Sequence, residues 1–587
     1  MVLLITDLSK YAFIILIALY TSLSYSVLRK RDQEEVRHGF RLQILNLFLI
    51  HALAFVVLYM QTGEIKLAVF YAFQFFLLQA VLVFTRIIYP KVNRLVLNNM
   101  CLLLAIGFIM LTRLSYDKAV RQFQIAAVAL AVALIVPVLI RKCAFLQKLP
   151  WLYGLCGLAL LMAVAVVGKT TSGAKLSLVI GKFVFQPSEF VKITFVFFVA
   201  AMLSKSTEFA DVVRTTILAA AHVLVLVASS DLGGALLFFV TYLVMLYVAT
   251  KKPLYFLAGL GAGSVAAVIG YHLFAHVRVR VLAWTDPFSV IENEGYRIAQ
   301  SLFAIGTGRW FGMGLNLGMP NKIPVVEQDF IFSAIAEELG GIFAVCLILI
   351  CMSCFIMFIN IAMQIKNRFY KYTALGFGTL YGFQVFLTIG GAIRFIPSTG
   401  VTLPLVSYGG SSLVSSILMF YIIQGMYLLK EDEDLQIEKE RAAKARKAKR
   451  PKTSRTKNKK NHELAVITYL FIGLFALMIG YLIYFDAVLS PEVINNPIIP
   501  DWTLFAERNI RGNILSSDGT VLAETKVASD GAETREYPYA NLFAHVVGYS
   551  TRGNTGIEQL ANLLPADIRY LPDGTVEKSG EKCEKSG

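Results

Sequence analysis

The stretch EQDFIFSAIAEELGGIFAVCLILICMSCFIMFINI (residues 327–361) places a polar segment directly before a long apolar run. From Phe330 onward this run exceeds the roughly 20 residues that an α-helix needs to cross a hydrocarbon core of about 30 Å. A carboxylate is expensive to leave beside lipid, so Asp329 at the start of the run is a candidate functional residue. Aspartate is also a favoured helix N-cap, and the spacing alone leaves both interpretations open.

Similar apolar runs recur along the whole chain of 587 residues, of which 57% are hydrophobic and only 16% are charged. The runs lack the alternation of membrane strands, and helices are the other structure that can cross a bilayer. We therefore predict an all-α polytopic membrane protein. The expected transmembrane helices, about fourteen in number, are 11–28, 42–61, 67–87, 98–113, 122–140, 150–168, 189–204, 211–228, 231–250, 253–273, 330–361, 372–393, 404–429 and 464–485.

Basic residues are concentrated in every second loop between these expected spans. Short loops rich in Lys and Arg stay on the cytoplasmic side of a membrane, so these loops predict the orientation. Residues 439–460 alone contain twelve Lys or Arg, and between two membrane helices such a run indicates a cytoplasmic linker and no nucleic-acid partner. The loops 169–188, 274–329 and 394–403 are then expected to face outward, as is everything after 485.

Polar clusters lie where expected spans begin on this outward side. Glu189 and Lys192 are three residues apart, so they should share one helix face and be able to pair. Such a pair is either an ordinary helix start or part of a functional site, because acids and bases are rare inside a membrane. Asp231, which precedes Leu-Gly-Gly234, is likewise either an N-cap or a functional carboxylate.

Two outward loops complete the polar set. The 274–329 loop contains several arginines and a glycine-rich stretch, 306–314, which either lets the backbone approach a ligand or is a flexible surface loop. No βαβ unit surrounds these glycines, so a dinucleotide site is not indicated. The hydroxyl-rich loop 396–412 could be a re-entrant turn whose hydroxyls satisfy backbone groups.

Five of these segments occur in a fixed order: QPSEFVK, DLGG, GYRIAQSLFAIGTGRWFGMGL, EQDFIFSAIAEELG and IPSTGVTLPLVSYGGSS. Together they resemble the SEDS family, the peptidoglycan polymerases of the RodA and FtsW type. The resemblance covers about residues 98–430. It implies a glycosyltransferase core of ten spans there, preceded by an extension of three helices in residues 1–97.

The resemblance implies that the protein polymerises lipid II on the outer face of the bacterial cytoplasmic membrane, in cell division, elongation or sporulation. Asp329 matches the family's essential loop aspartate and is expected to be the general base. Outward carboxylates and a pyrophosphate could also hold Mg²⁺ or Mn²⁺, although no ligand spacing identifies a metal site. The expected substrate-binding residues are Gln186, Ser188, Glu189, Lys192, Asp231, Arg278, Arg280, Arg297, Gln300, Glu338, Ser407, Gly409, Gly410 and Ser411.

The basic linker, 431–463, leads to the last span, 464–485, and to a tail that resembles the pedestal of a class B penicillin-binding protein. Around Asp518-Gly519 the sequence predicts two short strands joined by a turn. We expect a small extracytoplasmic α/β or β-rich pedestal fragment over 486–570 and a disordered tail over 571–587. The resemblance implies a polymerase fused to its usual partner, which would act with other divisome or elongasome proteins.

A transpeptidase needs a Ser-x-x-Lys nucleophile, a Ser-x-Asn and a Lys-Thr-Gly strand. The residues after 485 are too few to hold that domain, so no transpeptidase activity is expected. Two other functions stay open: a flippase or transporter of lipid-linked precursors, and a scaffold for cell-wall enzymes. A transporter should carry its charged groups near the membrane midplane, whereas the charged groups here are expected at the outer rim.

Overall fold

The computed structural model describes residues 2–29, 32–171, 174–180, 183–291, 295–447 and 462–494. It also describes 513–516, 518–527, 533–539, 542, 547, 568–570, 576–578 and 581–583. The chain divides into two compact units, Met1–Ser490 and Pro491–Gly587.

In the described part of the first unit, fourteen helices are long and apolar enough to cross a membrane. This number confirms the predicted class and the predicted count. The spans are α1 (Val2–Arg29), α2 (Gln33–Thr62), α3 (Ile65–Ile88), α4 (Arg94–Leu114), α5 (Tyr116–Ala133) with its continuation α6 (Val136–Lys142), α7 (Pro150–Val167), α8 (Pro187–Lys205), α9 (Phe209–Ala228), α10 (Leu232–Thr250), α11 (Pro253–Leu273), α15 (Gly341–Gln364), α16 (Arg368–Ala392), α17 (Gly410–Lys447) and α18 (His462–Tyr484).

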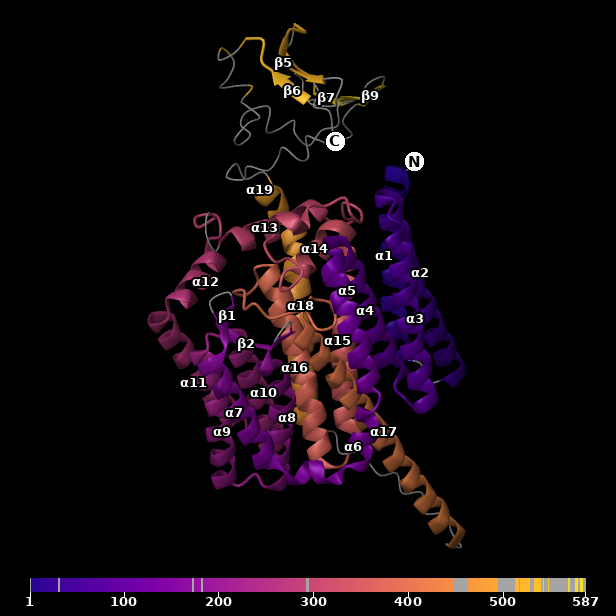
Figure 1. The fold of residues 1–587 in the computed structure, drawn as a ribbon, viewed down its shortest axis with the longest axis vertical. Coiled ribbons are helices and arrows are strands. Elements are labelled where there is room, and N and C mark those ends of the chain that lie inside the picture. Colours follow the sequence, from indigo (N-terminus) through magenta and orange to yellow (C-terminus); the bar gives the residue numbers. More distant parts are fainter. Residues whose placement is uncertain are drawn as a thin grey trace. The chain divides into compact units, whose positions relative to one another are not determined.

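Successive spans run in opposite directions, so the connecting segments alternate between two ends of the bundle (Figure 1). We call one end the Asp329 end; it holds the segments 168–186, 229–231, 274–340 and 393–409. The opposite end holds the segments 89–93, 143–149, 206–208, 251–252 and 365–367. The described basic segments 91–94, 141–148, 251–252 and 366–371, which helped to predict the orientation, lie at this opposite end.

The expected single span 330–361 is wrong, because two helices replace it. The short helix α14 (Ile331–Leu339) ends at Gly340, and α15 begins at the next residue. Gly340 has φ 92° and ψ 164°, a conformation that essentially only glycine adopts. A Cβ there would lie 2.5 Å from the backbone nitrogen of Gly312, so the break is fixed by close packing against the preceding loop.

Both long outward loops contain secondary structure that the sequence reading missed. Residues 169–185 form a three-stranded antiparallel sheet of β1 (Lys169–Thr171), β2 (Ala174–Ile180) and β3 (Phe183–Phe185), with β2 in the centre. The 274–329 loop contains α12 (Ala275–Thr285), α13 (Gly295–Gly308) and the 3₁₀ turn η2 (Pro320–Lys322). A second 3₁₀ turn, η1 (Ala144–Lys148), precedes α7 at the opposite end.

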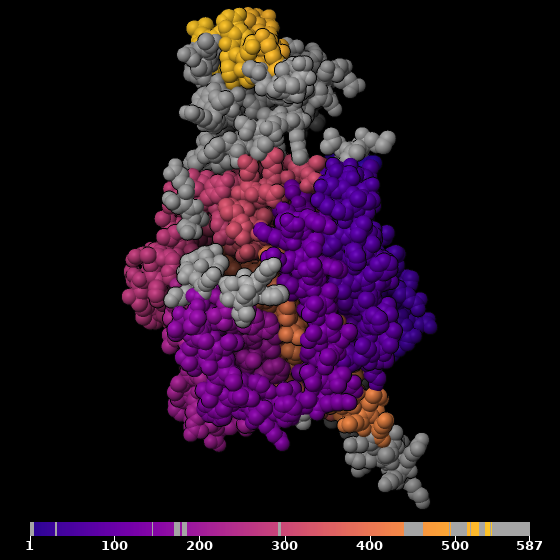
Figure 2. Space-filling model, viewed as in Figure 1, coloured from indigo at the N-terminus to yellow at the C-terminus, as the bar shows by residue number. Residues whose placement is uncertain are grey.

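The N-terminal extension packs directly on the rest of the bundle, with α1 against α15 and α2 against α4. The Tyr20 hydroxyl donates to Asn99 Oδ1 at 3.0 Å, and the Tyr25 hydroxyl donates to the carbonyl of Leu349 at 2.9 Å. Figure 2 shows these indigo helices along one side of the unit. The extension is therefore an integral part of the membrane bundle.

The last two spans continue beyond their expected limits. α17 remains helical to Lys447, past residue 430 where the linker was expected to begin, and its final turns leave the bundle (Figure 1). Residues 448–461 of that linker lie outside the described part. α18 packs against α15 and α16, with the rings of Phe355 and Phe471 4.7 Å apart. It continues into a π-helical turn, η3 (Phe485–Leu489), and into α19 (Ser490–Ile494).

The second unit contains two small antiparallel sheets. The first consists of β4 (Ile514–Leu515), β5 (Val521–Val527) and β6 (Glu533–Glu536), and Gly519 has φ 85° between β4 and β5. This hairpin confirms the strands predicted around Asp518-Gly519. The second sheet consists of β7 (Ile568–Tyr570), β8 (Val576–Lys578) and β9 (Glu581–Cys583). Where β8 and β9 lie, the expectation of a disordered tail is wrong, because the strands pair with each other.

Substituting Gly340→Ala tests the break between α14 and α15. Its backbone conformation alone should cost about 1–3 kcal/mol with a Cβ present, and the contact with Gly312 adds to this. We expect a lower melting temperature for the detergent-purified protein. Gly473→Ala in α18 is the matched control, because a Cβ there meets no atom within 4 Å. Equal melting temperatures for both variants would contradict the assignment of strain to Gly340.

Candidate functional site

Asp329 is held by an ion pair with Arg297 at the Asp329 end of the bundle. Arg297 Nη2 donates to Asp329 Oδ1 at 2.6 Å, and the guanidinium stacks on the ring of Phe330 at 4.9 Å. The carboxylate does not cap α14, whose N-cap residue is Phe330. The N-cap interpretation that the sequence left open is therefore wrong, and the carboxylate pairs with Arg297 instead.

The environment of Asp329 opposes its ionisation on balance. Burial raises the pKa of Asp329 above its usual value, although the positive charges of Arg297 and Arg280 act in the opposite direction. A carboxylate with a raised pKa is a stronger proton acceptor once it is ionised. Perturbed carboxylates of this kind concentrate at functional sites.

The backbone just before Asp329 is fixed by the hydroxyl-rich loop 396–409. The Ser407 hydroxyl donates to the carbonyl of Gln328, and the backbone N–H of Tyr408 donates to the carbonyl of Glu327 at 2.7 Å. The Glu327 side chain forms an ion pair with Lys118. Ser407, a predicted site residue, therefore binds the residue that precedes Asp329 and positions Asp329 through the main chain.

Gln122 of α5 clamps the same loop from the other side. Its amide nitrogen donates to the carbonyl of Ser407 at 3.0 Å, and its amide oxygen accepts from the N–H of Gly409 at 3.3 Å. At Gly410 a Cβ would lie 2.9 Å from Ile125, so this predicted glycine allows close packing against α5, whereas Gly409 contacts α5 through its N–H. Gln122 was missed from the sequence, where it looked like the polar edge of an expected span.

A second cluster lies in the first turn of α8. Lys192 Nζ is 2.7 Å from Glu189 Oε2, which confirms the predicted pairing of these side chains. The Ser415 hydroxyl of α17 donates to Glu189 at 2.8 Å, and Lys192 donates to Gln384 Oε1 of α16 at 3.0 Å. Ser415 and Gln384 were missed, because a lone polar residue in an apolar span looks like part of the helix packing.

The same turn of α8 contacts the start of α17 through its predicted polar residues. The backbone N–H of Gln186 donates to the Ser411 hydroxyl at 3.0 Å. The Gln186 amide nitrogen also donates to the Ser188 hydroxyl at 3.3 Å. These three predicted site residues therefore meet at the edge of the Glu189–Lys192 cluster.

Asp231 joins this cluster through electrostatics. Its carboxylate caps α10 by accepting from the N–H of Gly234 at 2.8 Å. Burial raises the pKa of Asp231, the negative charge of Glu189 adds to this, and Lys192 and Arg280 oppose it. The positive charge of Arg280 in α12 thus lowers the pKa of both Asp231 and Asp329.

Other predicted residues are placed differently. Arg278 is exposed and donates to the carbonyl of His272 at 3.2 Å, away from any carboxylate contact. Gln300 is buried in α13, one turn after Arg297. The adjacent Ser301 hydroxyl lies 2.6 Å from the Ser333 hydroxyl, so this turn fastens α13 to α14.

Glu338 serves the fold of the preceding loop. It is fully buried and lies 2.8 Å from Arg113 Nε of α4. The Glu337 carboxylate accepts from the N–H of Met319 at 2.7 Å, and burial raises the pKa of Glu337 to about 8. The glycine-rich stretch packs on the same helix: a Cβ at Gly312 would lie 2.5 Å from the Glu338 carbonyl. These glycines allow contact between two backbones, a role that neither sequence interpretation included.

The donor set does not fit a resident divalent cation. Among the residues that the structure describes, no three His, Cys, Asp or Glu side chains gather at a metal-binding distance. Asp329 is paired with Arg297 and Glu189 with Lys192, so cations of the protein already neutralise the carboxylates on this side.

Two family models match the chain. The model of the cell cycle proteins FtsW, RodA and SpoVE matches residues 93–428, which contain every site residue described above. The model of the penicillin-binding protein A dimerisation domain matches residues 511–564. The two matches confirm the resemblances drawn from the sequence to a polymerase core and to a penicillin-binding-protein pedestal.

Individual relatives are similar over most of their own length. The peptidoglycan glycosyltransferase RodA of Mycobacterium tuberculosis is 32% identical over 363 residues, covering 57% of this chain and 77% of the relative. The probable peptidoglycan glycosyltransferase FtsW of Escherichia coli O6:H1 is 34% identical over 364 residues, covering 58% and 86%.

Solved structures cover a similar share of this chain. One of a peptidoglycan synthase complex aligns with a TM-score of 0.49 and 27% identity, covering 58% of this chain and 98% of that one. The crystal structure of RodA from Thermus thermophilus aligns with a TM-score of 0.45 and 24% identity, covering 58% and 97%.

Glu338 and Asp329 each pair with an arginine, and the different exposure of these arginines predicts different effects on stability when each carboxylate is replaced by its amide. The Arg113 side chain is only 9% exposed, whereas that of Arg297 is 33% exposed. Glu338→Gln should destabilise by about 3–5 kcal/mol, because it leaves a buried guanidinium that cannot lose its charge. Asp329→Asn should leave stability at pH 7.5 unchanged or higher. A raised folded-state pKa means that ionised Asp329 costs stability once the pH exceeds that pKa.

Melting temperatures in one detergent check both variants. Glu64→Gln is the control, because its ion pair with Lys66 is about half exposed and such pairs contribute little. A loss of stability in Asp329→Asn as large as that in Glu338→Gln would show that Asp329 is a structural residue.

Proposed function

Because the chain belongs to the FtsW, RodA and SpoVE family of cell cycle proteins, we propose that its membrane bundle is a peptidoglycan glycosyltransferase. The substrate is lipid II, whose disaccharide-pentapeptide units are joined into glycan strands. The observation that carries the proposal is the ion pair of the buried Asp329 carboxylate with the partly exposed Arg297, which lies in the family-matched region and outside the candidate spans.

Asp329 is the general base. The acceptor sugar hydroxyl attacks the anomeric carbon of the growing strand, and the bond from that carbon to the pyrophosphate oxygen breaks. A neutral hydroxyl is a weak nucleophile, so a carboxylate within hydrogen-bonding reach must take its proton. Arg297 keeps a useful fraction of Asp329 ionised despite burial, because its positive charge lowers the pKa that burial raises.

The departing polyprenyl pyrophosphate carries the negative charge that develops in the reaction. Fixed cations that face a developing charge stabilise the transition state. Arg280 lowers the pKa of both carboxylates and makes no ion pair with any residue that the structure describes, so we assign it to the pyrophosphate. Lys192, already neutralised by Glu189, is better suited to hold the substrate by hydrogen bonds.

The positions of the charged groups favour a polymerase over a transporter. Asp329 and Asp231 lie outside the candidate spans, and Glu189 and Lys192 occupy the first turn of α8. A transport pathway would place such groups near the midplane. The Asp329 end is then the extracytoplasmic face, which agrees with the basic loops at the opposite end. The tail after α18 therefore faces the cell exterior.

A glycan-ladder gel tests the base directly. Purified protein incubated with lipid II should yield polymer, and Asp329→Asn should yield on the order of 10²–10⁴-fold less, the usual contribution of a general base. Ser407→Ala is a positioning control, because it leaves the carboxylate present and should retain part of the activity. Polymer from Asp329→Asn at the wild-type rate would remove Asp329 as the base.

The pH dependence separates the role of Arg297 from simple substrate binding. Loss of its charge should raise the pKa of Asp329 further, so Arg297→Gln should move the acid limb of the rate profile to higher pH. Arg297→Lys keeps the charge and should leave the limb near its wild-type position. Arg297→Gln should then lose more activity at pH 6 than at pH 8, and an equal loss at both would contradict the proposal.

The tail is proposed to activate the bundle in cis, as a piece of the partner that SEDS polymerases use. Two truncations separate its parts: removal of residues 456–587 takes away α18 and the second unit, whereas removal of 495–587 keeps α18. Activation by the second unit predicts that both truncations lower the rate of polymerisation. If only the longer truncation does so, activation resides in α18; wild-type rates from both would exclude activation in cis.

A further inference from the structure

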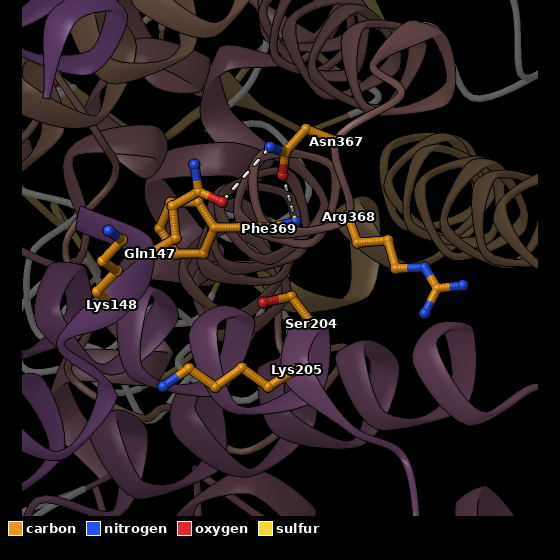
Figure 3. A pocket seen from close by; sticks show the side chains of 7 residues that line it. All are labelled: Gln147, Lys148, Ser204, Lys205, Asn367, Arg368 and Phe369. Atoms are coloured by element: carbon orange, nitrogen blue, oxygen red, sulfur yellow. Dashed lines mark hydrogen bonds between the residues drawn. The ribbon is translucent and has the colours of Figure 1, made fainter. Parts of the chain in front are cut away.

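A basic pocket lies at the end of the bundle opposite to the candidate site. It has a cavity volume of about 370 Å³ and lies between η1, the end of α8 and the start of α16. Figure 3 shows its lining residues: Gln147, Lys148, Ser204, Lys205, Asn367, Arg368 and Phe369. Three cations in one cavity call for a negatively charged occupant.

The three cations form no ion pair within the part of the chain that the structure describes. Lys148, Lys205 and Arg368 are all exposed. The acidic residue closest in sequence, Glu208, follows Lys205 by three positions without pairing with it. The charge of the pocket is therefore available to a ligand.

The walls of the pocket are ordered by hydrogen bonds. Asn367 Nδ2 donates to Gln147 Oε1 at 3.4 Å, and Asn367 Oδ1 accepts from the N–H of Phe369 at 2.9 Å (Figure 3). Asn367 thereby caps α16 and ties it to η1. Figure 3 also shows the Ser204 hydroxyl between Lys205 and the start of α16. The polar groups of three separate elements thus frame one cavity.

The surroundings indicate a lipid and not a free anion. The pocket lies at the ends of spanning helices, where headgroups of a bilayer are found. Trp151 is 50% exposed and Phe209 is 72% exposed, and they follow Lys148 and Lys205 in sequence by three and four residues. Tryptophan is enriched at the membrane–water interface, so an exposed Trp151 is typical of that depth. Basic pockets between membrane helices bind phosphate headgroups of lipids.

We propose that this pocket binds the phosphate of an anionic phospholipid from the leaflet at the opposite end of the bundle. Lys148, Lys205 and Arg368 supply the charge, and the Ser204 and Gln147 side chains supply polar contacts. α8 and α16 pack against each other, and each also carries a residue of the Glu189–Lys192–Gln384 network near its other end. A bound headgroup would therefore join the two helices at one end, as that network does at the other.

Native mass spectrometry of the purified full chain tests the proposal with phosphatidylglycerol and phosphatidylcholine as probes. We expect one retained phosphatidylglycerol, and a triple variant with Lys148→Gln, Lys205→Gln and Arg368→Gln should bind it on the order of 100-fold more weakly. The matched control removes three exposed cations elsewhere at the same end, through Lys91→Gln, Lys142→Gln and Lys252→Gln. The control should keep wild-type binding.

Three outcomes would overturn the proposal: equal weakening by both triple variants, equal retention of the two lipids, or displacement of the bound lipid by millimolar inorganic phosphate. Equal weakening would mean that only total charge matters. A charge-keeping variant with Lys148→Arg and Lys205→Arg should retain binding, and this separates loss of the site from misfolding. None of these readouts depends on glycan polymerisation, so failure here leaves the proposed enzyme activity untouched.

Discussion

Burial opposes the charge of Asp329, and the contacts of the Asp329 end hold this carboxylate beside one cation through the ion pair with Arg297. This ion pair connects α13, which the chain reaches first, to the segment that enters α14 32 residues later. The two side chains stay together only if α13 and α14 are fixed relative to each other. The contact between the Ser301 and Ser333 hydroxyls joins the two helices, and hydrogen bonds from Ser407 and Tyr408 fix the backbone of residues 327–328. The break at Gly340 separates α14 from the membrane span α15 that follows it. α14 can therefore contact α13, α4 and η2 as well as α15.

Much of this arrangement could be predicted from local patterns. Apolar runs predicted the number of spans, and basic residues predicted which loops share one side of the membrane. Both signals depend only on the local free energy of transfer between water and lipid. The pairing of Glu189 with Lys192 followed from helical spacing alone. Asp329 stood out because a carboxylate beside an apolar run needs a reason to be there.

What could not be predicted depends on contacts between distant parts of the chain. The break at Gly340 exists because the backbone of Gly312 lies against it, and no local pattern reports that approach. Gln384 and Ser415 join the site only because α16 and α17 bring them to α8. Glu338 looked like a site residue, yet its partner Arg113 lies 225 residues earlier. In each case the sequence shows the type of the residue, but it does not show which distant residue contacts it in the fold.

The packing of α18 against α15 and α16 has a consequence for how this protein is supplied to the membrane. Since the anchor and the bundle belong to one chain, their association is intramolecular, with an effective concentration that the connecting segment sets. Such an association does not weaken on dilution. When a cell makes more or less of this protein, the number of bundles changes. The fraction of bundles that carry an anchor stays constant. Two separate chains would need matched synthesis to keep that stoichiometry.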